Sequence, residues 1–182
     1  MKIDFTHIQD KHLEIIRNWR NSEGIKKYMY TETYITEEMQ RRWYETIKSK
    51  KDEIHWVVEV DGELVGKMDL RKIDMANKTA EWSFYIGEES AMGSGAGVLI
   101  EYQLLEYAFN ELKLHKLNCA VLDFNSRVIE LHKKFGFVEE GRIRQQILKG
   151  DQYVDVVLLG ILSEEWKVNR ARLQKVVERL KR

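Results

Sequence analysis

The stretch that decides the fold is residues 79–110, TAEWSFYIGEESAMGSGAGVLIEYQLLEYAFN. It opens with apolar residues at every second position, which predicts a half-buried strand; they are Ala80, Trp82, Phe84 and Ile86. A loop with three glycines follows, and behind it apolar residues recur in steps of four and three. That spacing predicts a helix, with one face formed by Val98, Tyr102, Leu105, Phe109 and Leu112.

The loop carries Gly93, Gly95 and Gly97 directly before the predicted helix. Glycine lets the backbone adopt positive φ and approach a ligand closely. The first amides of a helix lack intrahelical partners and lie at the positive end of its dipole. The loop is therefore typical of a phosphate-binding turn. A plain tight turn between strand and helix remains the alternative.

Two common phosphate-binding motifs are absent. No GxxxxGK[ST] pattern starts at Gly93, so this is not a P-loop. The three glycines give GxGxG instead of the dinucleotide pattern GxGxxG, and Asp123 lies too far along the chain to be that motif's ribose-binding acid.

Composition narrows the class of protein. The 182 residues predict one domain, 1–182, and 30 Lys and Arg balance 30 Asp and Glu, so no net charge favours nucleic acid or acidic membranes. The single cysteine, Cys119, allows no intramolecular disulfide and is expected to be a buried thiol. We find no signal peptide, no membrane-spanning run and no metal-ligand spacing, and we expect a cytoplasmic protein without a metal.

The rest of the chain alternates strands and helices. Asp61-Gly62 separates two strand-like runs, which predicts a hairpin with a type I′ turn. Thr36 is expected to cap a helix whose inward residues are Met39, Trp43 and Ile47, and Ser163 to cap the last helix. The order of elements predicts an α+β fold, with a mixed, mainly antiparallel sheet and helices on its faces. The expected strands are 1–6, 54–60, 63–70, 79–86, 116–122, 137–140, 143–149 and 153–162, and the expected helices are 11–21, 36–50, 98–112, 127–135 and 163–182.

A family resemblance emerges from motifs in a fixed order. The glycine loop is followed by residues 125–137, NSRVIELHKKFGF, and this set resembles the GCN5-related N-acetyltransferase (GNAT) superfamily over nearly the whole chain. Residues 139–142, EEGR, resemble the branch that contains ribosomal-protein and polyamine acetyltransferases. Within that branch, residues 19–21 and 106–117 are most similar to the N-acetyltransferases of the pseudaminic-acid pathway.

The resemblance implies the GNAT fold and acetyl-CoA as cosubstrate. It also implies transfer of the acetyl group to the 4-amino group of a UDP-linked sugar, UDP-4-amino-4,6-dideoxy-N-acetyl-β-L-altrosamine, for pseudaminic acid biosynthesis and flagellin glycosylation. The alternatives are a ribosomal-protein N-terminal or polyamine acetyltransferase of the same branch, and a non-catalytic acyl-CoA-binding domain. The expected partners are acetyl-CoA and a small amine, without nucleic acid or membrane, and a homodimer is left open.

The resemblance assigns the acetyl-CoA site to the loop and its neighbours. The diphosphate is expected on the loop and the helix start, and the pantetheine arm along the strand near Phe84 and Ile86. Asn125 is expected either to bind the arm or to cap its helix. The family usually has Arg or Gln at the position of Met92, whose backbone amide still serves. The loop residues are Met92, Gly93, Ser94, Gly95, Ala96 and Gly97.

Three residues are candidates for proton transfer. The family often has Tyr where His132 stands, which leaves the general acid open between His132 and Tyr85. In related enzymes a glutamate placed like Glu81 takes the amine proton, often through water. His132 as a packed helix-edge residue and Glu81 as a solvated carboxylate are the structural alternatives.

The acceptor is expected to bind the N-terminal helices, which are rich in aromatic residues and arginine. A nucleotide sugar needs aromatic surface for its base and cations for its diphosphate, and the candidates are Arg17, Arg20, Tyr28 and Tyr30. Arg41 and Arg42 are further cations. Trp19 and Trp43 are expected to be core residues, with a binding role as the alternative.

Overall fold

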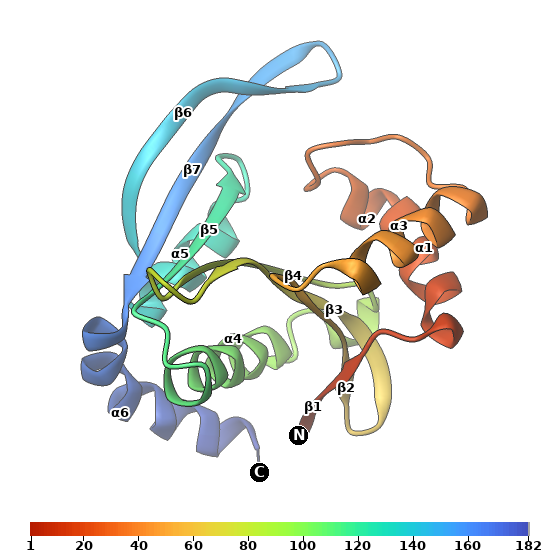
Figure 1. Ribbon diagram of the computed structural model, residues 1–182. Coiled ribbons are helices and arrows are strands. Elements are labelled where there is room, and N and C mark those ends of the chain that lie inside the picture. Colours follow the sequence, from red (N-terminus) through yellow and green to blue (C-terminus); the bar gives the residue numbers. More distant parts are fainter. Residues whose placement is uncertain (182) are drawn as a thin grey trace. The chain divides into compact units, whose positions relative to one another are not determined.

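The computed structural model describes residues 1–181. The hydrogen-bonding order of the strands is β1-β2-β3-β4-β5-β7-β6, with β4 and β5 parallel. The neighbouring pairs β1–β2, β2–β3, β5–β7 and β6–β7 are antiparallel, so the predicted mainly antiparallel α+β fold is confirmed. The elements are β1 (Ile3–His7), α1 (Leu13–Asn21), α2 (Glu23–Lys26), α3 (Glu37–Ser49), β2 (Ile54–Val60), β3 (Glu63–Asp74), β4 (Thr79–Ile86), α4 (Ala96–Glu106), β5 (Lys116–Leu122), α5 (Ser126–Phe135), β6 (Val138–Lys149), β7 (Gln152–Leu162) and α6 (Ser163–Leu180) (Figure 1).

The chain forms two compact units, which we describe separately. The first unit contains residues 1–72 and 83–97, and the second contains residues 73–82 and the chain from Val98 onward. The assignment of residues 1–182 to a single domain stays a prediction. Within residues 1–181, no helix has the length and apolar character needed to cross a bilayer.

The hairpin of the first unit forms as predicted. Val60 pairs with Glu63, so the turn between β2 and β3 has two residues, Asp61 and Gly62. Both have left-handed φ, 51° and 90°, the geometry of a type I′ turn. The amide of Lys2 donates to Oδ1 of Asp61 at 2.7 Å, which ties this turn to the chain just before β1.

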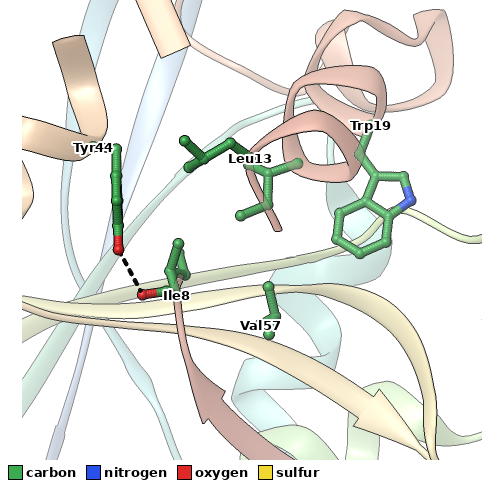
Figure 2. Close-up of a cluster of buried hydrophobic side chains, with 6 residues drawn as sticks. Ile8, Leu13, Trp19, Tyr44 and Val57 are labelled. Carbon is green, nitrogen blue, oxygen red and sulfur yellow. Dashed lines mark hydrogen bonds between the residues drawn. The ribbon is translucent and has the colours of Figure 1, made fainter. Parts of the chain in front are cut away.

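The core of the first unit forms where α1 and α3 pack on the sheet. Leu13 and Trp19 of α1 lie against Val57 of β2 and Tyr44 of α3 (Figure 2). The Tyr44 hydroxyl donates to the carbonyl of Ile8 at 3.4 Å, so the polar end of this ring has a partner inside the cluster. Trp19 is 4 % exposed, which confirms its interpretation as a core residue.

Helix α3 begins as predicted but turns a different face inward. The Thr36 side chain caps it by accepting a hydrogen bond from the Met39 amide at 3.2 Å. The prediction that Met39 points inward is wrong, because this side chain is 41 % exposed. Gln40 and Tyr44 are buried instead, since the core cluster takes up the Tyr44 ring and this sets the rotation of the helix. Trp43 is only partly buried at the border of that cluster.

Helix α4 of the second unit buries a face that only partly matches the predicted one. Ile100, Leu104 and the predicted Leu105 are fully buried, and the predicted Phe109, in the helical turn Tyr107–Glu111 that follows, is also buried. Val98 and Tyr102, which the predicted face included, are only partly buried. The reason is that α4 is apolar almost all round, so the spacing of its apolar residues alone does not select one face.

The end of α5 and the start of α6, both in the second unit, are stabilised in different ways. Gly136 ends α5 with φ of 106°, as expected of a glycine in this position. Ser163 is the first residue of α6, so its predicted capping role is wrong. The helix start is satisfied in another way, because the carboxylate of Glu165 accepts a hydrogen bond from the Leu162 amide at 2.8 Å. Figure 1 shows β6 and β7 of this unit as a long hairpin.

Gly66 permits a close approach of two backbones in the first unit. A Cβ at this position would lie 2.1 Å from the carbonyl oxygen of Tyr85. We expect Gly66→Ala to lower the free energy of unfolding by about 1–3 kcal/mol, because backbone atoms give way less easily than side chains. Urea titration measures the loss. Gly24→Ala is the control, since a Cβ there meets nothing within 4 Å. Equal stability of the two variants would contradict the role of Gly66.

Candidate active site

The glycine loop has the backbone geometry that the sequence predicts. Gly93 and Gly95 have φ of 78° and 97°, in the left-handed region that favours glycine. Ser94 braces the loop, because its hydroxyl donates to the Ala91 carbonyl at 2.7 Å and accepts from the Ala96 amide at 3.2 Å. The loop is therefore shaped before any ligand arrives.

The loop leads directly into the N-terminus of α4. The first turn of this helix carries no acidic residue, and Met92, Gly93 and Ser94 before it are exposed. Ser94 engages the amide of Ala96, and the following amides of the first turn have no partner within the helix. The amides of Met92 and Ser94 already donate to the carbonyls of Glu89 and Ala91, whereas first-turn amides without intrahelical partners, at the positive end of a helix dipole, suit a diphosphate group.

Strand β4 carries candidate residues of both units. The parallel ladder between β4 and β5 runs from the pair Thr79–Lys116 to the pair Glu81–Asn118. Phe84 and Ile86, the residues predicted to face the pantetheine arm, follow this ladder. Because side chains alternate along a strand, Glu81, Ser83 and Tyr85 share the other face.

Tyr85 and Arg20 in the first unit each leave a buried polar atom without a partner. The Tyr85 ring lies edge-on to Trp19, with centroids 6.5 Å apart. Its hydroxyl is buried and unpaired, and burial raises the pKa of Tyr85, with the charge of Arg20 opposing that rise. Nη1 of Arg20 is also buried and unpaired, and burial lowers the pKa of Arg20. Buried polar groups of this kind usually have a partner, which can be ordered water, an ion or a ligand.

The charges near Tyr85 are mostly positive. Asp69 on β3 forms an ion pair with Arg71, whose Nε lies 2.8 Å from Oδ1, accepts from the Ser83 hydroxyl at 3.0 Å, and also pairs with Lys67. Burial alone would raise the pKa of Asp69, but the nearby Lys67 and Arg71 charges lower it overall. The carboxylate therefore stays ionised and is fully engaged by these neighbours, so it does not neutralise Arg20 as well.

The end of α1 is held against the segment that follows β4. The Trp19 indole donates to Glu88 Oε1 at 2.6 Å, and a Cβ on Gly87 would lie 2.2 Å from the indole ring. This contact requires glycine at position 87. It fixes the helix turn that carries Arg20 close to the strand end that carries Tyr85.

The other predicted acceptor residues differ in their surroundings. Arg17 is mostly buried and lies 3.6 Å from the carboxylate of Glu37. Tyr28 and Tyr30 are 38 % and 46 % exposed in the segment after α2. The Tyr28 ring already has the Lys27 ammonium 4.8 Å from its centroid, and Arg17 already has an anionic neighbour.

His132 in the second unit lies deeper than its place at a helix border suggested. Its imidazole is 3 % exposed and packs against Trp82 and Phe137, with ring centroids 5.0 and 5.4 Å away. Nδ1 lies 2.9 Å from Oε1 of Glu101, a carboxylate of α4 with no exposed surface. Glu101 was not among the predicted site residues. The signal was present, because it shares the buried helix face of Leu104 and Leu105.

Asn125 takes the N-cap position of α5 without a side-chain capping bond. The backbone amide of Asn125 donates to the Leu122 carbonyl at 2.9 Å, and this hydrogen bond forms the turn before the helix. Asn125 was expected either to cap α5 or to bind the pantetheine arm, and its side chain makes no capping hydrogen bond.

The comparisons with known proteins identify the family. Residues 2–138 match the acetyltransferase (GNAT) domain, and the chain belongs to this family. It is 28 % identical over 160 residues to a spermidine N(1)-acetyltransferase of Vibrio cholerae, covering 87 % of this chain and 91 % of that one. The acetyltransferase PseH of Campylobacter jejuni is 25 % identical over 134 residues, or 74 % and 82 % of the two chains.

The likeness extends to solved structures. The spermidine N-acetyltransferase of Vibrio cholerae in complex with CoA and spermine superimposes with a TM-score of 0.84 at 26 % identity, covering 91 % of this chain and 98 % of that one. The protein is thus an acetyl-CoA-dependent N-acetyltransferase, and the binding of the cosubstrate's diphosphate by the glycine loop stays a prediction. Among residues 1–181, no group of three or more His, Cys, Asp or Glu is arranged to hold a metal ion.

Gly95 offers a test of the loop. With φ of 97°, Gly95→Ala strains the backbone and moves the amides before α4. We expect CoA to bind at least about tenfold more weakly, which is about 1.4 kcal/mol, by isothermal titration calorimetry. Gly150→Ala is the control, since Gly150 also has left-handed φ, 58°, but lies in the β6–β7 turn. If both variants bind CoA like the unchanged protein, the loop is not the phosphate site.

Proposed function

We propose that the enzyme acetylates the 4-amino group of a UDP-linked 4-amino-4,6-dideoxy sugar, a step of pseudaminic acid biosynthesis that serves flagellin glycosylation. The observation that carries the proposal is that two of the buried, unpaired polar atoms of the first unit, Nη1 of Arg20 and the hydroxyl of Tyr85, belong to side chains that interact electrostatically. The proposed location is the cytoplasm, because acetyl-CoA and nucleotide sugars are made there.

The unpaired atoms favour an acceptor rich in oxygen. Both groups donate hydrogen bonds, and phosphate or sugar oxygens are the partners that they lack. In this region the cations Lys67 and Arg71 pair with Asp69, and Glu88 accepts from the Trp19 indole, so the described contacts give Arg20 no carboxylate partner. A polyamine with several positive charges is repelled there, whereas a diphosphate is attracted.

The exposed rings after α2 supply the second requirement of a nucleotide. Tyr28 and Tyr30 present flat apolar surface on which a uracil ring can stack. In the proposal Arg20 anchors the anionic part of the acceptor, and these two rings hold the base. Arg17 contributes less, because Glu37 already balances its charge.

The proton transfers are assigned to three side chains. We assign to Glu81 the uptake of the amine proton, and to Nε2 of His132 the delivery of a proton to the leaving sulfur. Since burial raises the pKa of Tyr85, its phenol stays protonated at neutral pH and acts as a hydrogen-bond donor, not as a base. Phe84, Ile86 and Asn125 are assigned to the pantetheine arm, and residues 92–97 to the diphosphate.

A polyamine acceptor is the second candidate. The observation in its favour is the likeness to the Vibrio cholerae enzyme, whose structure contains CoA and spermine. Such an acceptor requires carboxylates that are free to bind ammonium groups. Asp69 is already engaged by Lys67, Arg71 and Ser83, which is why we rank this candidate second.

The acceptor assignment is tested by following release of the CoA thiol from acetyl-CoA. The amines are UDP-4-amino-4,6-dideoxy-N-acetyl-β-L-altrosamine, spermidine and an N-terminal ribosomal peptide. We expect kcat/KM for the sugar to exceed that for the others at least about a hundredfold, or about 2.7 kcal/mol. Preference for spermidine or the peptide would overturn the sugar assignment and leave the enzyme class standing.

Arg20 gives a sharper test at the residue level. Arg20→Gln removes the charge and keeps polar character, so we expect KM for the nucleotide sugar to rise at least about tenfold. KM for acetyl-CoA should change little. Arg42→Gln is the matched control, because Arg42 is an exposed cation on α3 paired with Glu38 at 2.6 Å. Equal effects of the two changes on the sugar KM would contradict the anchoring role.

A further inference from the structure

We infer that Glu101 is a positioning residue for His132: its carboxylate binds Nδ1 of the imidazole and thereby makes Nε2 the nitrogen that exchanges a proton during acetyl transfer. The inference deepens the proposed function, because it rests on the proposed role of His132 as general acid. It does not depend on which amine is the acceptor.

The contact joins two helices inside the second unit. Glu101 projects from α4 and His132 from α5, and Nδ1 lies 2.9 Å from Oε1. Both residues are buried, with Glu101 0 % and His132 3 % exposed. Oε2 of Glu101 is buried without a partner, so the imidazole is its main source of stabilisation.

A carboxylate in this setting is costly unless it has a proton or a positive partner. Burial raises the pKa of Glu101, and the charge of His132 and the hydrogen bond to it oppose that rise. Two arrangements satisfy the pair, an ionised carboxylate with an imidazolium or a protonated carboxyl with a neutral imidazole. The arrangement with an imidazolium is the acid form. In it, Nδ1–H donates to the Glu101 carboxylate and Nε2 carries the other proton of the ring.

Aromatic rings and one thiol surround the pair. Trp82 of β4 and Phe137 pack against the imidazole of His132. Cys119 of β5 is the titratable neighbour of Glu101, and burial raises the pKa of its thiol well above the usual value, so it stays neutral. Glu101 and His132 are therefore the ionisable pair of this cluster.

The chemical step balances with one proton from His132. The neutral amine attacks the thioester carbonyl, the C–N bond forms and the C–S bond breaks. The sulfur leaves with the electron pair of that bond and takes the proton of Nε2, while the amide nitrogen loses its extra proton to Glu81. The imidazole ends neutral, still bonded through Nδ1–H to Glu101, and regains its proton from solvent.

The test is the pH profile of kcat for Glu101→Gln. The amide keeps the size of the side chain and removes the negative charge that stabilises the protonated imidazole. As the pH rises, the variant therefore loses activity earlier than the unchanged enzyme does. We expect the basic limb of its pH profile to move down by about one pH unit. KM for acetyl-CoA should stay within about twofold.

Glu106→Gln is the matched control. Glu106 lies on the same helix and accepts hydrogen bonds from the Trp166 indole at 3.1 Å and from Arg170 Nε at 2.6 Å. We expect Glu106→Gln to lower the melting temperature and to leave the pH profile of kcat unchanged. If Glu101→Gln behaves in the same way, with a lower melting temperature and an unchanged profile, Glu101 is only structural and the inference fails.

Two further variants keep the test decisive. Glu101→Asp retains the charge, so we expect the basic limb to stay at the pH of the unchanged enzyme even if Glu101→Gln does not fold; a limb that moves down with Asp would overturn the inference. His132→Gln tests the proposed acid separately, and an unchanged profile there would overturn the role of His132 and the inference with it. All profiles use whichever amine the unchanged enzyme acetylates, so failure of the sugar assignment is seen independently.

Discussion

The alternation of side chains along β4 is the constraint on which the site depends. Trp82 points into the core of the second unit, where it is 2 % exposed and contacts His132. Glu81, Ser83 and Tyr85 must then share the opposite face, because successive side chains of a strand point to opposite sides. One strand thus anchors a core with one set of residues and presents candidate proton donors and acceptors with the other.

Buried polar groups mark the places where the structure departs from what stability alone favours. In the first unit, Arg20 and Tyr85 keep donors without partners, although an unpaired buried donor costs about 1–3 kcal/mol. In the second unit, a carboxylate and an imidazole lie among aromatic and aliphatic side chains. Such groups are retained where binding or proton transfer uses them, which is why they carry the two proposals.

Similarity to known acetyltransferases establishes the class of enzyme and its cosubstrate. In our proposal the choice of acceptor depends on a few side chains near Tyr85, and identities of 25–28 % do not carry such details from one enzyme to another. The local balance of charge is more informative here. Lys67 and Arg71 both engage Asp69, which is why we propose that the substrate pairs with the positive charge of Arg20.

The sequence by itself determined the α+β class, the β2–β3 turn at Asp61-Gly62, the glycine loop before α4 and the stop at Gly136, because each depends on local spacing or on a backbone conformation that few residues adopt. It did not determine which face of α3 or α4 is buried, because the core cluster that takes up the Tyr44 ring sets the rotation of α3, and α4 is apolar almost all round. Only the tertiary structure decided that Tyr44, and not Met39, enters the core, that Arg20 and Tyr85 lack partners, and that Glu101 meets His132 from 31 positions away. These features depend on contacts between residues far apart in the chain, and local sequence patterns contain no record of such contacts.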